Sequence, residues 1–158
     1  MRFHCFFRLI TFLFLTDSIV STILAAELIF EVAAYGSLLL PKDLAYIISI
    51  STVLILNIFI CFASMSIWVF LKVKSHEGIL NAWRFLSAFG FIRIIFEIIS
   101  IAEYNYKEII GNFCQNIKEG NLGNSLCSAQ DRFDVYNVIS FCVQTVLTLI
   151  IMIIYCKL

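Results

Sequence analysis

Apolar residues fill four long stretches of the chain, and charged residues separate these stretches from one another. A helix rises 1.5 Å per residue, so about 20 residues cross a hydrocarbon core of roughly 30 Å. In the third stretch Arg93 and Glu97 stand four residues apart, which is helical spacing and not the alternation of a barrel strand. The pattern predicts four transmembrane helices, at about residues 9–30, 44–71, 85–101 and 135–156.

The composition agrees with a membrane protein. Of the 158 residues, 61% are apolar and 14% are charged, whereas soluble domains average about 45–50% and about 25%. Eleven basic and eleven acidic residues cancel, which gives no support for a nucleic-acid partner. We therefore expect an all-α, integral membrane four-helix bundle with antiparallel, up-down-up-down topology and a single domain over residues 1–158. Its partners would be membrane lipids and other integral membrane proteins.

The basic residues predict the orientation in the membrane. One side of the predicted bundle carries six lysines and arginines and the other side carries four, so the positive-inside rule places both termini in the cytosol. The segment Glu103–Asp134 would then be extracellular or lumenal, in the plasma membrane or an endomembrane of a eukaryotic cell. An alternative is that Arg2, Arg8 and the apolar residues after them form a signal peptide, whose cleavage would leave three spans.

Four cysteines outside the apolar centres of the spans suggest two kinds of chemistry. Cys114 and Cys127 lie in the predicted outer segment with twelve residues between them, and an oxidising compartment favours a disulfide between them. The alternative is two free thiols. Cys5 and Cys156 lie at the predicted cytosolic ends of the first and last helices, where cysteines are acceptors for palmitoylation. They can equally be ordinary small packing residues.

Polar side chains inside the spans predict an interhelical network. Ionisable groups at mid-membrane cost about 2.5–3.5 kcal/mol on insertion scales, so each needs a partner. Counting from flanking charges puts Asp17 and Arg93 at a matching depth of about 13–14 Å, as an ion pair. The same count puts Glu97, Gln144 and Asn57 in a second layer at about 20–22 Å. Such a network either fixes the packing of the bundle or forms a proton relay, an ion relay or a polar ligand cavity. A third alternative leaves Glu97 neutral or facing a partner subunit.

The sequence lacks the patterns that signal catalysis or cofactor binding. There is no Cys-x-x-Cys or His-Glu-x-x-His motif, and His4 and His76 lie far apart with no neighbouring nucleophile. The cysteine pair has no histidine nearby, and structural zinc requires four ligands. We expect no enzymatic activity, no metal and no cofactor.

The predicted topology, the chain length and the Cys114/Cys127 pair resemble the small tetraspan membrane proteins, most closely the MARVEL-domain group. Tetraspanins also place polar residues in several helices, but their Cys-Cys-Gly element is missing here, as is the claudin Trp-Gly-Leu-Trp pattern. The resemblance rests on topology and carries over no binding residues. It implies membrane organisation, vesicle trafficking or chaperoning of partner proteins.

Three functions follow from these observations. The first is a multi-pass membrane organiser or adapter that acts through lipid and membrane-protein contacts, as in trafficking or microdomain scaffolding. The second is a transporter or channel subunit built around Asp17, Arg93 and Glu97, which would need a homo-oligomer because four helices are few for a pore. The third is a lipid-modifying membrane enzyme that uses the same carboxylates as acid and base.

Overall fold

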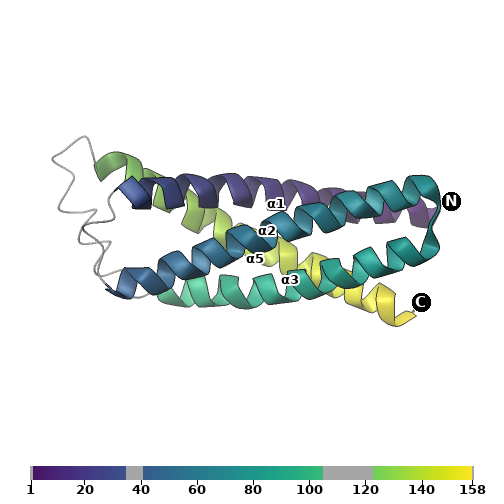
Figure 1. Ribbon diagram of the computed structural model, residues 1–158. Helices are drawn as coiled ribbons and strands as arrows, with labels where there is room; N and C mark the ends of the chain where they lie inside the picture. The colour runs from purple at the N-terminus through teal and green to yellow at the C-terminus, as the bar shows by residue number, and fades with distance from the viewer. Residues whose placement is uncertain (1, 35–40, 105–122, 158) are drawn as a thin grey trace.

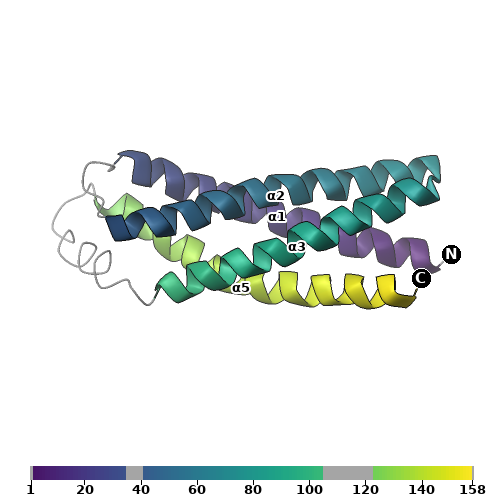
Figure 2. The same ribbon diagram turned by 60° about the horizontal axis from the view of Figure 1, so that its bottom comes forward.

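The computed structural model describes residues 2–34, 41–104 and 123–157. They form four long α-helices that lie side by side in an elongated bundle (Figures 1 and 2). The helices are α1 (Arg2–Ala34), α2 (Pro41–Val73), α3 (His76–Tyr104) and α5 (Gly123–Lys157). Around the bundle α1 packs on α2, α2 on α3, α3 on α5, and α5 on α1. The start of α1, the α2–α3 turn and the end of α5 lie at one end, which we call the turn end (Figure 1).

A three- and four-residue spacing of buried side chains explains why the helices pack along their whole length. On α3 the buried positions include Leu86, Gly90, Arg93, Glu97 and Ser100. This heptad-like spacing keeps one seam of each helix facing its neighbours, as in left-handed helical bundles. The same spacing recurs on α5, at Leu126, Gln130, Phe133, Asn137, Ser140, Gln144, Leu147 and Ile151.

The core consists of two apolar clusters with a polar section between them. The turn-end cluster includes Phe14, Ile67, Trp83, Leu86 and Ile151, from all four helices. The second cluster lies toward the opposite end of the bundle, which we call the loop end. This loop-end cluster comprises Ala25, Leu28, Ile50, Leu126, Ala129 and Phe133, from α1, α2 and α5. Because lipid tails are as apolar as these side chains, the clusters stabilise a bundle in lipid through close van der Waals packing more than through the hydrophobic effect.

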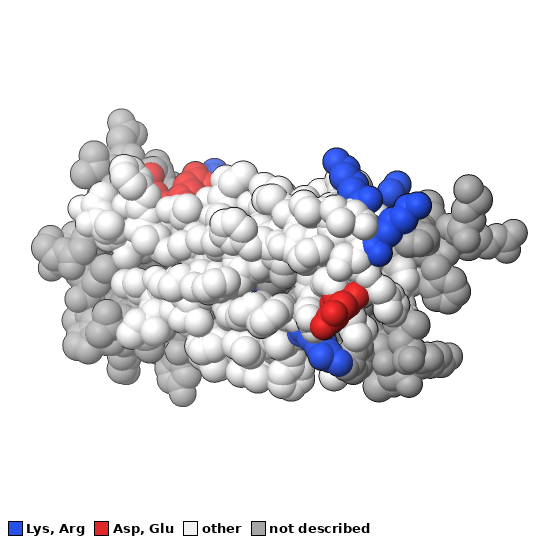
Figure 3. All heavy atoms as spheres, turned by 45° about the vertical axis from the view of Figure 1, so that its right-hand side comes forward, with Lys and Arg blue, Asp and Glu red and all other residues white. Residues whose placement is uncertain are grey.

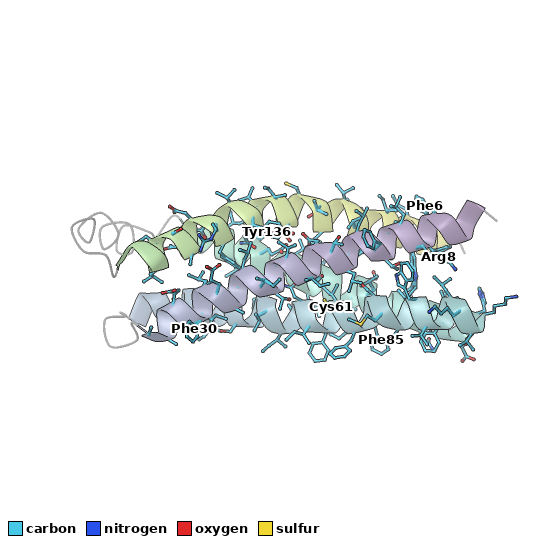
Figure 4. The ribbon with its side chains drawn as sticks, turned by 90° about the horizontal axis from the view of Figure 1, so that it is seen from above. Phe6, Arg8, Phe30, Cys61, Phe85 and Tyr136 are labelled. Carbon is cyan, nitrogen blue, oxygen red and sulfur yellow. The ribbon has the colours of Figure 1, made fainter. Side chains whose placement is uncertain are left out.

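Three helices of the described chain are long and apolar enough to cross a bilayer. They contain the segments Phe6–Ala34, Ile47–Val73 and Leu126–Ile154. Large apolar side chains such as Phe6, Phe30 and Phe85 are exposed on the outside of the bundle (Figure 4). The charged residues in view gather toward the two ends and leave a broad uncharged middle (Figure 3). This is the surface of a helical membrane protein.

The connection between α2 and α3 is shorter than the turn of residues 72–84 that the charges suggest. Only Lys74 and Ser75 separate the two helices. Lys74 has a left-handed backbone (φ 57°), and the Ser75 amide donates to the Phe70 carbonyl at 3.1 Å, as in a Schellman motif. The Ser75 hydroxyl accepts from the Gly78 amide at 3.3 Å and caps α3. The two backbone motifs allow a nearly immediate reversal of the chain.

The last helix begins earlier than the sequence suggests, at Gly123 and not near Val135. The predicted start at residue 135 is therefore wrong. Leu126, Ala129 and Phe133 of residues 123–134 pack in the loop-end cluster. Their spacing of three and four residues is helical, but the intervening polar residues lower the mean hydropathy and hide the helix from a search for apolar stretches.

A buried polar cluster as candidate functional site

Arg93 is the centre of the polar section, and its side chain is 0% exposed. Its Nε donates to Glu97 Oε1 at 2.9 Å, one helical turn further along α3. Its Nη1 lies 3.2 Å from Asp17 Oδ2 and 3.4 Å from Ser18 Oγ, both on α1. Its Nη2 donates to Ser140 Oγ on α5. One guanidinium therefore connects three helices.

The Asp17 carboxylate accepts hydrogen bonds at both of its oxygens. Tyr136 OH donates to Oδ1 at 2.9 Å. Ser140 Oγ donates to Oδ2 at 3.0 Å, and Gln144 Nε2 donates to the same oxygen. Together with Arg93, this places four donor side chains around one carboxylate. These hydrogen bonds compensate for the loss of water around the buried Asp17 carboxylate.

Glu97 is less well satisfied, although it is also 0% exposed. Its Oε1 accepts from Arg93 and lies 3.4 Å from Ser140 Oγ. Ser140 has one hydroxyl hydrogen, and it can donate that hydrogen either to Glu97 or to Asp17, whose Oδ2 is closer at 3.0 Å. Within the described part of the chain, Glu97 Oε2 and Gln144 Oε1 are buried and have no hydrogen-bond partner. The cluster thus contains two carboxylates, one guanidinium and two acceptor oxygens without donors.

The five residues predicted as a network do not all meet. Asp17, Arg93, Glu97 and Gln144 lie in one hydrogen-bonded cluster, in which Gln144 bonds directly to Asp17. The expected division into two depth layers therefore differs from the structure. Counting residues from flanking charges assumes that all helices end at the same height, and these helices extend beyond those charges by different amounts.

Asn57 lies outside this cluster. It takes part in one of two interhelical hydrogen bonds that lie between the cluster and the loop end. Its Nδ2 donates to Ser21 Oγ at 2.9 Å, between α2 and α1. Asn137 Nδ2 donates to Ser100 Oγ at 3.4 Å, between α5 and α3. These contacts extend the polar section by about one helical turn on the loop-end side of Asp17 and Glu97. They link neighbouring helices without charge.

Sequence reasoning missed three members of the cluster. Ser18 and Ser140 are small polar residues that are unremarkable within apolar stretches, although Ser140 stands four residues before Gln144 on the buried seam. Tyr136 is the third, and its position at the start of the predicted last span gives no sign of a contact with Asp17. Its side chain is half-buried and bonds to Asp17 where α5 runs beside α1 (Figure 4), because α5 starts twelve residues earlier than predicted.

A second interhelical arginine–carboxylate pair lies nearer the loop end. Arg132 Nη2 on α5 donates to Glu27 Oε1 on α1, and Arg132 Nη1 donates to Ser128 Oγ at 2.8 Å. The Arg132 and Glu27 side chains are 51% and 40% exposed. This pair joins the same two helices as the Asp17–Ser140 contact, but at the surface.

The predicted cysteine chemistry stays a prediction. Cys127 lies on α5, and its proposed partner Cys114 lies outside the described residues. The side chains of Cys5 and Cys156 also lie outside the described part. Cys61 and Cys142 are free thiols within the spans. Among the described residues, no group of three His, Cys, Asp or Glu side chains is arranged to hold a metal ion.

The outer surface of the described helices has grooves between neighbouring helices, and the buried cluster does not line the two described next. The larger, of about 490 Å³, lies between α2 and α3 and has aromatic walls and small residues along it. Its aromatic residues are Phe59, Phe62, Phe70, Phe85 and Phe89. The second, of about 380 Å³, lies between α3 and α5 and includes Trp83, Arg84 and Phe91.

Comparisons with known proteins give no family assignment. No protein-family model matches the chain, and no curated protein or solved structure matches it with significance. The resemblance to small tetraspan proteins therefore rests on the sequence pattern alone, and the functional argument rests on the geometry described above.

Proposed function

We propose that the protein is a multi-pass membrane organiser or adapter that acts through contacts with lipids and other integral membrane proteins. The observation that carries this proposal is the division of the bundle into an apolar exterior and a polar interior. Phe62 and Phe85 are 64% and 61% exposed, whereas Arg93 and Glu97 are 0% exposed. In lipid, such an exterior is the surface available to partners.

The proposal includes a four-span topology with a defined orientation in the membrane. In it α3 is the fourth membrane span, because Arg93 and Glu97 are buried, contact each other and Asp17 inside the bundle, and do not face lipid. Both termini lie in the cytosol with Arg8, Lys72 and Lys74, and the chain between α3 and α5 lies outside, with Cys114 joined to Cys127 by a disulfide. A homo-oligomer is compatible with the exposed helix faces.

The α2–α3 groove is the strongest local support for a contact surface. Phe59 and Phe89 stack with ring centroids 5.2 Å apart, and Phe85 stacks on Phe89 at 6.2 Å. Gly78 lets the Phe70 ring lie against α3, since an added Cβ would stand 2.6 Å from Phe70 Cδ1. Ordered rings beside small residues form a shaped apolar surface for an acyl chain or another helix.

A photo-crosslinking experiment in native membranes tests the organiser. A photoreactive phenylalanine analogue replaces Phe85 in the groove, Val143 on an exposed face of α5, or the buried Phe14 as a control. We expect the probe at position 85 to give one defined membrane-protein adduct. The substitution Ala63→Phe fills the groove and should abolish this adduct. The same mixture of lipid adducts at Phe85 and Val143, with no defined protein adduct at either, would contradict the proposal.

A transporter or channel subunit is the second candidate. The observation in its favour is the pair of buried acceptor oxygens without donors, on Glu97 and Gln144. In proteoliposomes this candidate predicts proton or cation flux that Glu97→Gln removes and Glu27→Gln leaves intact. Flux no greater than that of empty liposomes would leave the organiser as the better assignment.

A further inference from the structure

We propose that the buried cluster is a proton-binding site and that Glu97 holds one exchangeable proton while the bundle is folded. This inference does not depend on the organiser function, because it concerns the charge balance of the interior. It assigns a ligand, the proton, to a group of side chains that the packing of the bundle alone does not explain.

The first argument is the charge count. The groups facing the cluster are Asp17 from α1, Arg93 and Glu97 from α3, and Tyr136 from α5, with Cys61 of α2 interacting electrostatically with Arg93. With both carboxylates ionised, the cluster has one negative charge in excess. An uncompensated charge in a low-dielectric interior is costly, and gaining a proton is the usual remedy.

The second argument decides which carboxylate takes the proton. Four donor side chains surround Asp17, at both of its oxygens, so protonation there would displace a donor. Glu97 receives Arg93 Nε at Oε1, whereas Oε2 has no partner among the described residues. A proton on Oε2 therefore costs no existing hydrogen bond.

The third argument is a buried hydrogen-bond acceptor that has no donor in the described part of the chain, Gln144 Oε1. Gln144 is 0% exposed, and its amide nitrogen bonds to Asp17, so the side chain lies within the cluster. Its Oε1 is buried and unpartnered in the described structure. A protonated Glu97 supplies a donor in a cluster that has one acceptor too many. The bond formed is Oε2–H, the proton comes from water, and releasing it restores the carboxylate.

The alternative counterion is a monovalent cation. Such an ion requires several oxygen ligands, and the described cluster offers two buried oxygens without donors, Glu97 Oε2 and Gln144 Oε1. The other carboxylate oxygens already accept from Arg93, Tyr136 or Gln144. A proton needs one oxygen and satisfies the charge balance, which is why we assign the site to it.

Infrared spectroscopy of the full chain in nanodiscs at neutral pH, with labelled glutamate, tests the assignment. We expect a carbonyl band of one protonated glutamic acid that Glu97→Gln removes. The matched control, Glu27→Gln, changes the exposed carboxylate of the other pair and retains the band. Absence of the band in the folded wild type, or its persistence in Glu97→Gln, would overturn the proposal.

A second measurement uses only the wild type and so does not depend on the folding of a variant. Unfolding in an ionic detergent at neutral pH exposes Glu97 to water, where an ordinary carboxyl is ionised. We expect release of close to one proton per chain, and a thermal midpoint that falls as the pH rises. No proton release, together with a midpoint that depends on sodium or potassium but not on choline, would replace the proton by a cation.

Discussion

Arg93 and Arg132 both join α1 to other helices, and the contrast between them shows how environment decides what an ion pair does. Arg93 is fully buried and contacts Asp17, Ser18, Glu97 and Ser140. Arg132 is half-exposed and contacts Glu27 and Ser128. The chemical groups are the same, but water or lipid headgroups can replace the partners of Arg132, and nothing replaces those of Arg93.

The difference matters for the assembly of the bundle. A buried ion pair gains little over an apolar replacement of the same shape, but removal of one partner leaves a charge that cannot be solvated. The exposed pair loses only a screened attraction when one partner is removed. We therefore expect the buried cluster to contribute more than the outer pair to the register of α1, α3 and α5.

Truncating the two arginines should give the largest difference. We expect Arg93→Ala to lower the free energy of unfolding by about 3–5 kcal/mol, because the Asp17 carboxylate remains buried without a positive charge beside it. Arg132→Ala should cost at most about 1 kcal/mol. Reversible unfolding in mixed micelles, followed by circular dichroism, measures both. Equal losses for the two variants would show that burial does not separate the pairs.

Removing a neutral donor should have a smaller effect with the same direction. Tyr136→Phe deletes the 2.9 Å hydrogen bond to Asp17 Oδ1 and preserves the ring. We expect a loss of about 1.5–3 kcal/mol, the range for hydrogen bonds to charged groups. The matched control is Ser128→Ala, which removes the 2.8 Å contact of the exposed Arg132. The same unfolding assay should detect no more than about 0.5 kcal/mol for the control.

The same contrast explains what the sequence could predict. The four helices follow from the apolar stretches, and the Asp17–Arg93 contact was suggested by matching depths, because charges inside an apolar stretch must find partners. The contacts of Gln144 and Tyr136 were not accessible, since they depend on where α5 begins. That start is hidden in residues 123–134, whose buried Leu126 and Phe133 alternate with polar side chains on the outer face.

The smallest expected effect distinguishes the pairs by their response to salt. A double-mutant cycle of Glu27→Gln and Arg132→Gln should give a coupling of about 0.5 kcal/mol at low ionic strength. This coupling should vanish near 1 M salt, where the Debye length is about 3 Å. The cycle of Asp17→Asn and Arg93→Gln should keep its larger coupling at both concentrations, because ions do not enter the packed interior. If the Asp17–Arg93 coupling also vanished in salt, water would have to reach that pair, and the cluster would be an open cavity and not a sealed one.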